Sequence, residues 1–159
     1  MRSLNTPEID IAIFGFLFNF VWEVWQAPLF ENMANMTATE ATSHCTLAAL
    51  GDVVILLGSF WVIALTARSR NWIFHPKALN VAGFISIGVV ITVVLEAAAI
   101  HFHRWQYADA MPTLPILGTG ITPVLQWLTI PPISVLLVRR QQTLGQSRSH
   151  VASQETHTK

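Results

Sequence analysis

Three carboxylic acids, Glu23, Asp52 and Glu96, interrupt stretches of this chain that are otherwise strongly apolar. A charge near the middle of a bilayer costs about 3 kcal/mol on insertion scales, so three would cost about 9 kcal/mol. That is comparable with a typical folding stability of about 5–15 kcal/mol. Clustered carboxyls suit proton transfer or cation binding. The alternative is structural, because a protonated carboxyl can hydrogen-bond across helices and stabilise their packing.

Polar and small residues recur at helical spacing around these acids, so each apolar stretch is predicted to have one polar face. The pattern comprises Asn19, Glu23 and Gln26 in the first stretch, Gly51 and Asp52 in the second, Gly88, Thr92 and Glu96 in the third, and Thr122, Gln126 and Thr129 in the fourth. At a rise of 1.5 Å per residue, Glu23, Asp52 and Gln126 lie about 12 Å below the predicted outer helix ends, and Glu96 lies about 8 Å below. The sequence therefore predicts one polar layer in the outer half of the membrane.

These positions give a candidate site. We predict that Glu23, Asp52 and Glu96 act as general acid or base, or stabilise a carbocation, and that His44 relays or tunes a proton. The predicted substrate-binding residues are Asn19, Trp22, Gln26, Arg104, Tyr107 and Gln126. Arg104 is expected to pair with Glu96 or with an anionic substrate.

Metal binding is an alternative use of the same region. His101 and His103, beside Glu96, are residue types that bind transition metals. We assign no metal site on this pattern alone, and the sequence identifies no cofactor.

The composition determines which class of protein must position these residues. Of 159 residues, 52% are hydrophobic and 11% are charged, whereas soluble domains carry about 25% charged residues. High hydrophobicity excludes a disordered chain. Nine basic residues balance nine acidic ones, which argues against nucleic-acid binding. A single cysteine, Cys45, excludes an internal disulfide framework and a cysteine-rich zinc module.

Four apolar stretches account for the hydrophobic excess, at residues 11–30, 45–66, 78–100 and 118–138. Each has about 20 residues, enough to cross a hydrocarbon core of about 30 Å. We therefore predict an all-α fold, an integral membrane four-helix bundle with its polar layer in the outer half. Residues 1–138 would form one transmembrane domain. Residues 139–159 are polar and are predicted to be a disordered cytoplasmic tail.

The Lys and Arg residues predict the orientation, because they concentrate on the cytoplasmic side of membrane proteins. Eight of the nine fall in the N-terminus, the second connection or the C-terminal segment: Arg2, Arg68, Arg70, Lys77, Arg139, Arg140, Arg148 and Lys159. Only Arg104 lies in a connection predicted to be outside. Both termini are therefore expected in the cytoplasm.

Several short motifs carry a resemblance: Trp22-Glu23, His44-Cys45, Gly51-Asp52, Arg104-Trp105-x-Tyr107, Met111-Pro112 and Gly118-x-Gly120-x-x-Pro123-x-x-Gln126-Trp127. Over residues 9–138 the chain resembles an uncharacterised family of small four-helix bacterial inner-membrane proteins. The resemblance implies a multi-pass protein of the bacterial inner membrane, and it implies no activity. In architecture alone the chain is also similar to the sterol-isomerase and sigma-2-receptor group, which suggests acid/base chemistry on a lipid-phase substrate.

The sequence leaves three functions open. The first is a membrane enzyme that uses acid/base chemistry on a lipid-phase or amphiphilic substrate. The second is a proton- or cation-linked transporter or channel subunit, although the cytoplasmic halves of the stretches are nearly all apolar. The third is an accessory subunit that binds a membrane-protein partner, a pigment or a lipid. Self-association into a homo-oligomer is compatible with all three, and the lipid bilayer is the one partner common to them.

Overall fold

The computed structural model describes the backbone of residues 6–33 and 35–157, and side chains as far as Gln141. This part of the chain contains helices and no extended strand, which confirms the prediction of an all-helical fold. The α-helices are α1 (Pro7–Gln26), α2 (Ala38–Thr66), α3 (Ala78–His101) and α4 (Ile121–His157). Short 3-10 helices are η1 (Ala27–Leu29), η2 (Glu31–Met33) and η3 (Arg70–Ile73).

Three helical segments in the described residues are long and apolar enough to cross a membrane: Ala38–Thr66, Ala78–His101 and Ile121–Gln141. They correspond to the second, third and fourth predicted stretches. The α1 helix is not among them, and it contains the acidic residues Glu8, Asp10 and Glu23. Membrane-spanning potential is thus found for three of the four predicted segments.

The helix boundaries differ from the predicted ones for local reasons. The first helix runs over Pro7–Gln26, earlier than residues 11–30, since proline is favoured in the first turn of a helix. The second begins at Ala38 because Thr37 and Glu40 form a capping box. Thr37 Oγ1 accepts from the Glu40 backbone N–H at 3.3 Å, and Glu40 Oε2 accepts from the Thr37 backbone N–H at 2.8 Å.

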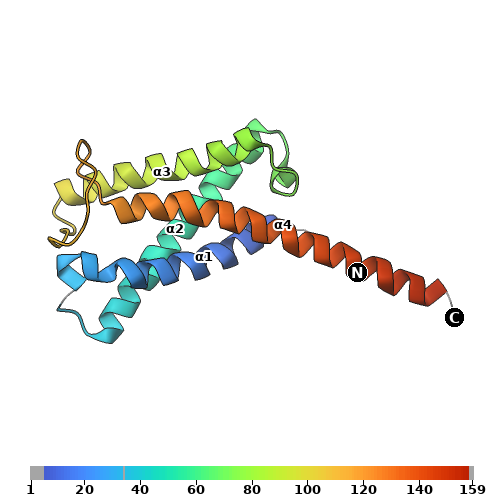
Figure 1. The fold of residues 1–159 in the computed structure, drawn as a ribbon, viewed down its shortest axis with the longest axis horizontal. Helices are drawn as coiled ribbons and strands as arrows, with labels where there is room; N and C mark the ends of the chain where they lie inside the picture. Colours follow the sequence, from blue (N-terminus) through green and yellow to red (C-terminus); the bar gives the residue numbers. More distant parts are fainter. Residues whose placement is uncertain (1–5, 34, 158–159) are drawn as a thin grey trace.

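The α4 helix is continuous from Ile121 to His157. The predicted boundary at residue 138, between membrane domain and tail, therefore does not coincide with a helix end. Figure 1 shows α4 extending well past the other helices on one side of the molecule.

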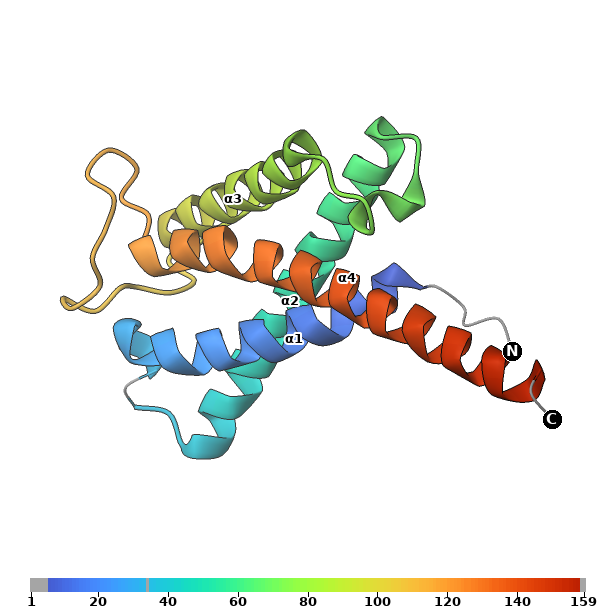
Figure 2. The same cartoon turned by 45° about the vertical axis from the view of Figure 1, so that its right-hand side comes forward.

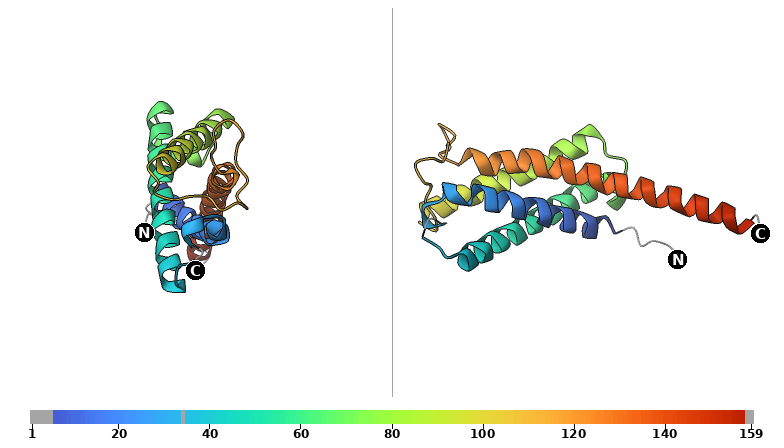
Figure 3. Two further views of the ribbon diagram at one scale, coloured as in Figure 1. Left: turned by 90° about the vertical axis from the view of Figure 1, so that its left-hand side faces the viewer. Right: turned by 60° about the horizontal axis from the view of Figure 1, so that its bottom comes forward.

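The helices are arranged so that two of them diverge. Helix α1 packs along α2 and α4, and α4 also packs against α3 (Figure 1). Helices α2 and α3 meet near η3 and separate toward their other ends, as Figures 2 and 3 show from three further directions. We call the end with η3 and the start of α1 the η3 end. The opposite end, with η1, η2 and residues 102–120, is the loop end.

Aromatic packing fills the interior near the η3 end. The Trp72 ring lies 5.7 Å from that of Phe60 and 5.6 Å from that of Phe84, and Trp72 Nε1 donates to the Phe60 carbonyl at 3.3 Å. Arg70 joins η3 to the start of α1 by donating to both carboxylate oxygens of Glu8, each at 2.8 Å. This half of the molecule is therefore apolar inside and held to α1 at its surface.

A close approach between α3 and α4 depends on a glycine. A Cβ atom added to Gly88 would lie 1.9 Å from Cε3 of Trp127, an impossible contact. The indole of Trp127 is 2% exposed and thus packs directly on the α3 backbone. Gly88, predicted as part of a polar face, instead gives Trp127 the room that any larger residue would occupy.

Candidate functional site

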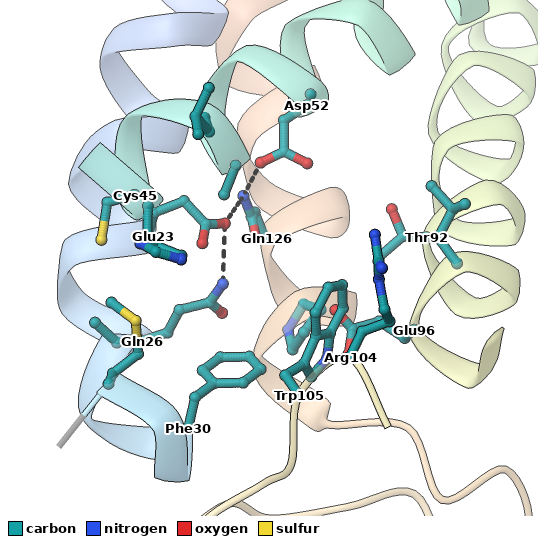
Figure 4. A pocket seen from close by; sticks show the side chains of 18 of the residues that line it. Glu23, Gln26, Phe30, Cys45, Asp52, Thr92, Glu96, Arg104, Trp105 and Gln126 are labelled. Atoms are coloured by element: carbon teal, nitrogen blue, oxygen red, sulfur yellow. Dashed lines mark hydrogen bonds between the residues drawn. The ribbon is translucent and has the colours of Figure 1, made fainter. Parts of the chain in front are cut away.

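A cavity of about 840 Å³ lies toward the loop end, between the four helices. Glu23 from α1, Asp52 from α2, Glu96 from α3 and Gln126 from α4 all line it (Figure 4). The structure thus brings together the four residues expected in one layer. They converge because each lies on the inner face of its helix, at a similar distance from the loop end.

Gln126 connects the acids of two different helices. Its side-chain Nε2 donates to Glu23 Oε1 at 3.1 Å and to Asp52 Oδ2 at 2.8 Å. It also lies 2.8 Å from Asn19 Oδ1. Asn19 is oriented by its own Nδ2, which donates to the Gly15 carbonyl at 2.8 Å, so its oxygen must face Gln126. Gln126 is 2% exposed, and the amide at the centre of this network is therefore shielded from solvent.

A second amide supports Glu23 from its own helix. Gln26 Nε2 donates to Glu23 Oε1 at 2.9 Å, and Gln26 Oε1 accepts from Trp22 Nε1 at 3.2 Å. The indole N–H can only donate, so it determines which end of the Gln26 amide faces the carboxylate. Trp22 thereby orients Gln26, and Gln26 holds Glu23 toward the cavity.

Glu96 is held by the connection that follows α3. Its Oε2 accepts from Trp105 Nε1 at 3.3 Å and from the Tyr107 hydroxyl, and the Tyr107 oxygen accepts from the Gly120 backbone N–H at 2.9 Å. Burial, followed by the hydrogen bond to Glu96, raises the pKa of Tyr107 above its ordinary value. The phenol therefore stays protonated and acts as a donor to Glu96.

Backbone pairing at the loop end positions Tyr107. Glu31 N donates to the Gln106 carbonyl at 3.1 Å, and Ala108 N donates to the Leu29 carbonyl at 3.0 Å. The Phe30 ring lies 5.5 Å from the Tyr107 ring. The connection after α3 is thus fastened to the segment after α1, although Phe30 and Tyr107 are 77 positions apart in the sequence.

The predicted site residues divide into two groups. Those that line the cavity are Glu23, Gln26, His44, Asp52, Glu96, Arg104 and Gln126. Asn19, Trp22 and Tyr107 do not line it, but each hydrogen-bonds to a residue that does. These three residues are predicted to contact the substrate. In the structure their hydrogen bonds orient the side chains of Gln126, Gln26 and Glu96.

Two predicted interactions are not formed. Glu96 is paired with Trp105 and Tyr107 rather than with Arg104. In the part of the chain that the structure describes, Arg104 makes no ion pair, and its side chain is exposed at the cavity. His44 is also exposed, its Nδ1 lies 3.1 Å from the carbonyl of Glu40, one turn earlier, and no hydrogen bond joins it to Glu23, Asp52 or Glu96.

The alternative metal site is not assembled either. Among the described residues, no group of three or more His, Cys, Asp and Glu side chains is arranged to hold a metal ion. His101 and His103 are exposed at the end of α3, and the His101 ring lies against Phe102 at 5.1 Å. His103 has a φ of 52°, which turns the chain away from the helix.

Several cavity residues are not among the predicted site residues. Thr92 is 8% exposed, lines the cavity, and its hydroxyl has no hydrogen-bond partner. Thr92 lies one helical turn before Glu96, and this spacing places it on the predicted polar face. Trp105 also lines the cavity, but an aromatic residue is common at a membrane interface and does not by itself indicate a site. Leu47, Val54 and Leu95 also line the cavity. Nothing in the sequence separates these three from side chains that only face lipid.

Comparison with models of protein families, with curated proteins and with solved structures finds no match to this chain. The function must therefore be inferred from the geometry of the cavity.

Proposed function

We propose that this chain is a membrane enzyme that transfers protons to and from a lipid-phase or amphiphilic substrate, with Glu23 and Asp52 as its acid/base pair. One observation carries the proposal. The two carboxyls, from different helices, share the Nε2 of Gln126 in the wall of one large cavity. A purely structural hydrogen bond between helices would need no such cavity.

The number of available protons supports this use of the pair. An amide nitrogen has two hydrogens, yet Gln126 Nε2 lies within hydrogen-bond distance of three acceptor oxygens. A single proton held by one of the two carboxyls supplies the missing donor. The pair then offers one neutral acid and one carboxylate base side by side, as enzymes with paired carboxyls do.

Such a pair can catalyse a proton shift without any other reactant. The carboxylate accepts a proton from one atom of the substrate, and the neutral carboxyl donates its proton to another atom. The substrate ends as an isomer of the same composition, and the pair still holds one proton. Glu96, held by Trp105 and Tyr107, would then orient a polar group of the substrate.

The packing near the η3 end favours an enzyme over a transporter or channel. A through-path needs polar access from both sides of the membrane. The interior near the η3 end is instead filled by buried side chains, Phe60, Trp72, Phe84 and Val138 among them. This cluster supports a cavity that is closed toward the η3 end.

We also propose a four-helix bundle with both termini in the cytoplasm of a bacterial cell, embedded in the inner membrane. Helix α1 lies along α2 and α4, and its 20 residues extend about 30 Å, the thickness of a hydrocarbon core. The η3 end carries Arg68, Arg70, Lys77, Arg139 and Arg140. Among the described residues of the loop end, the one arginine or lysine is Arg104. This distribution favours the η3 end as cytoplasmic.

Reporter fusions test this orientation. Alkaline phosphatase fused after Asp109 is expected to be active, because the loop end would be periplasmic. Green fluorescent protein fused after Lys159 is expected to fluoresce, because the C-terminus would be cytoplasmic. The opposite pair of signals would contradict the proposed topology and the location of the cavity in the outer half.

Hydrogen exchange tests the proposed chemistry without knowledge of the substrate. Protein reconstituted in nanodiscs with the total lipid extract of its expression host is incubated in D2O, and the extracted lipids are measured by mass spectrometry. The wild type is expected to introduce solvent deuterium into a carbon-bound position of one lipid species. The double variant Glu23→Gln/Asp52→Asn is expected to match empty nanodiscs. Asp109→Asn, an exposed acid outside the cavity, is the control and should match the wild type. Equal labelling by wild type and double variant would contradict the proposal.

A further inference from the structure

We infer that the cavity binds an amphiphile with an anionic head group, a phosphate or a carboxylate, and that this molecule enters from the bilayer between α2 and α3. The inference rests on the proposed function for the site's location in the membrane, and it adds the charge of the ligand and its route.

Arg104 is a cationic side chain in the cavity wall that has no acidic partner among the described residues. Glu23 and Asp52 receive amide donors, and Glu96 receives donors from Trp105 and Tyr107. Arg104, by contrast, has five N–H groups and makes no ion pair within the described residues. One oxygen of each acid already accepts a donor from the protein, whereas the guanidinium of Arg104 has no acidic partner in the described part of the chain. A ligand with acceptor oxygens therefore fits Arg104, because Arg binds phosphate and carboxylate preferentially.

A second, buried donor points to the same ligand chemistry. The Thr92 hydroxyl is in the cavity wall, has no partner, and belongs to a residue that is 8% exposed. Threonine hydroxyls in helices usually donate to the carbonyl one turn earlier, as Thr42 and Thr46 do here. Figure 4 shows Thr92 beside Glu96 and Arg104 on one side of the cavity. A rotation of the Thr92 side chain would bring its buried hydroxyl to an oxygen of the ligand at this position.

Apolar side chains of α2 and α3 indicate that the ligand also has an apolar part. Leu47 and Val54 on α2 and Leu95 on α3 line the cavity, yet they are 68%, 70% and 51% exposed. Side chains that line a cavity and are also exposed mark where it opens. His44 and Arg104 mark a polar part of the opening, whereas Leu47, Val54 and Leu95 mark an apolar part. Helices α2 and α3 separate from each other toward the loop end (Figure 2), so an opening between them would face lipid rather than water. An alkyl chain fits this opening, whereas a free inorganic anion does not.

Small residues keep the route clear. Gly51 lines the cavity beside Asp52, and a Cβ added to Gly51 would meet no atom within 4 Å. Gly58 lies two turns further along α2 and is equally open, but it does not line the cavity. The chain thus offers two matched positions, of which one would obstruct the route and the other would not.

The test uses single-chain probes that differ in head-group charge. Myristoyl lysophosphatidic acid is the anionic probe, monomyristoylglycerol the neutral one and myristyltrimethylammonium the cationic one, each measured with the full chain by native mass spectrometry. Lysophosphatidic acid is expected to bind about tenfold more tightly than monomyristoylglycerol. Arg104→Gln is expected to remove this difference, while binding of monomyristoylglycerol stays the same.

The glycine pair tests the route. Gly51→Trp is expected to weaken binding of lysophosphatidic acid at least about tenfold, and Gly58→Trp to leave it unchanged. Both variants are first compared with the wild type in thermal unfolding, to show that they fold. Tighter binding of the cationic probe, equal effects of both tryptophans, or displacement of lysophosphatidic acid by inorganic phosphate would each overturn the inference.

The experiments distinguish a failure of the proposed enzyme activity from a failure of the inferred ligand and route, because a ligand can bind without being turned over. Binding of lysophosphatidic acid without deuterium exchange would contradict the proposed enzyme and leave this inference standing. Exchange into an uncharged lipid, with no preference for the anionic probe, would overturn this inference alone.

Discussion

Replacing Gln126 with methionine is expected to lower the free energy of unfolding by about 2–4 kcal/mol. Methionine has a similar length and shape but no N–H group, so two donors would be lost to the three acceptors Asn19, Glu23 and Asp52. Hydrogen bonds within membranes contribute about 0.6 kcal/mol each on average, and a buried polar group without a partner costs about 1–3 kcal/mol more. Unfolding in mixed micelles of mild detergent and dodecyl sulfate, followed by circular dichroism, measures this loss.

Thr129→Val is the matched control for Gln126→Met. Thr129 lies one turn later on α4, and its hydroxyl donates only to the Leu125 and Gln126 carbonyls of its own helix. Its replacement should change the stability by less than about 0.5 kcal/mol. The loss caused by Gln126→Met should also shrink in an Asp52→Val background, because one of the unmatched acceptors is then absent. A stability of Gln126→Met equal to that of Thr129→Val would show that the amide does not hold the helices together.

Single substitutions within the acid pair are expected to have the largest effect on turnover. Asp52→Asn and Glu23→Gln should each slow the deuterium exchange about 100-fold or more, the usual contribution of a general acid or base. The amide oxygen of either variant can still accept from Gln126 Nε2, so the helices should stay packed. Rates of exchange per protein molecule in nanodiscs, with thermal unfolding alongside, separate loss of chemistry from loss of fold.

Glu96→Gln provides the internal comparison for the acid pair. Glu96 accepts from Trp105 and Tyr107 and does not share the Gln126 amide, so its loss should slow exchange only about tenfold. If Glu96→Gln were as severe as Asp52→Asn, the three acids would act as one unit. If Asp52→Asn exchanged at the wild-type rate, Asp52 would have no role in proton transfer.

The helical pattern allows much of the site to be predicted. Residues three or four apart lie on one helix face, and the rise per residue gives their depth, so the sequence places Glu23, Asp52, Glu96 and Gln126 at one level. All four line the cavity. Local geometry within a helix depends only on positions along the chain, which is why this part is accessible from sequence.

Partner choice cannot be predicted in the same way, because it depends on segments far apart in the chain. Charge alone favours a pair between Arg104 and Glu96. The backbone pairing of residues 106 and 108 with residues 31 and 29 turns Tyr107 toward Glu96 instead, and Arg104 is left without an ion pair in the described part of the chain. Gly88 likewise fits a polar face by its spacing, whereas its role is to admit Trp127.

The sequence by itself predicted a helical protein, four apolar segments long enough to cross a membrane, and one polar face on each helix. The structure confirms that the chain is helical and that three of these segments are long and apolar enough to span a membrane. The tertiary structure alone decided which donors hold which acids and where the cavity opens. The physical reason is that helix periodicity is a local property, whereas the divergence of α2 from α3 depends on packing between distant segments. Apolar residues such as Leu47, Val54 and Leu95 look alike in sequence whether they face lipid or the mouth of a cavity.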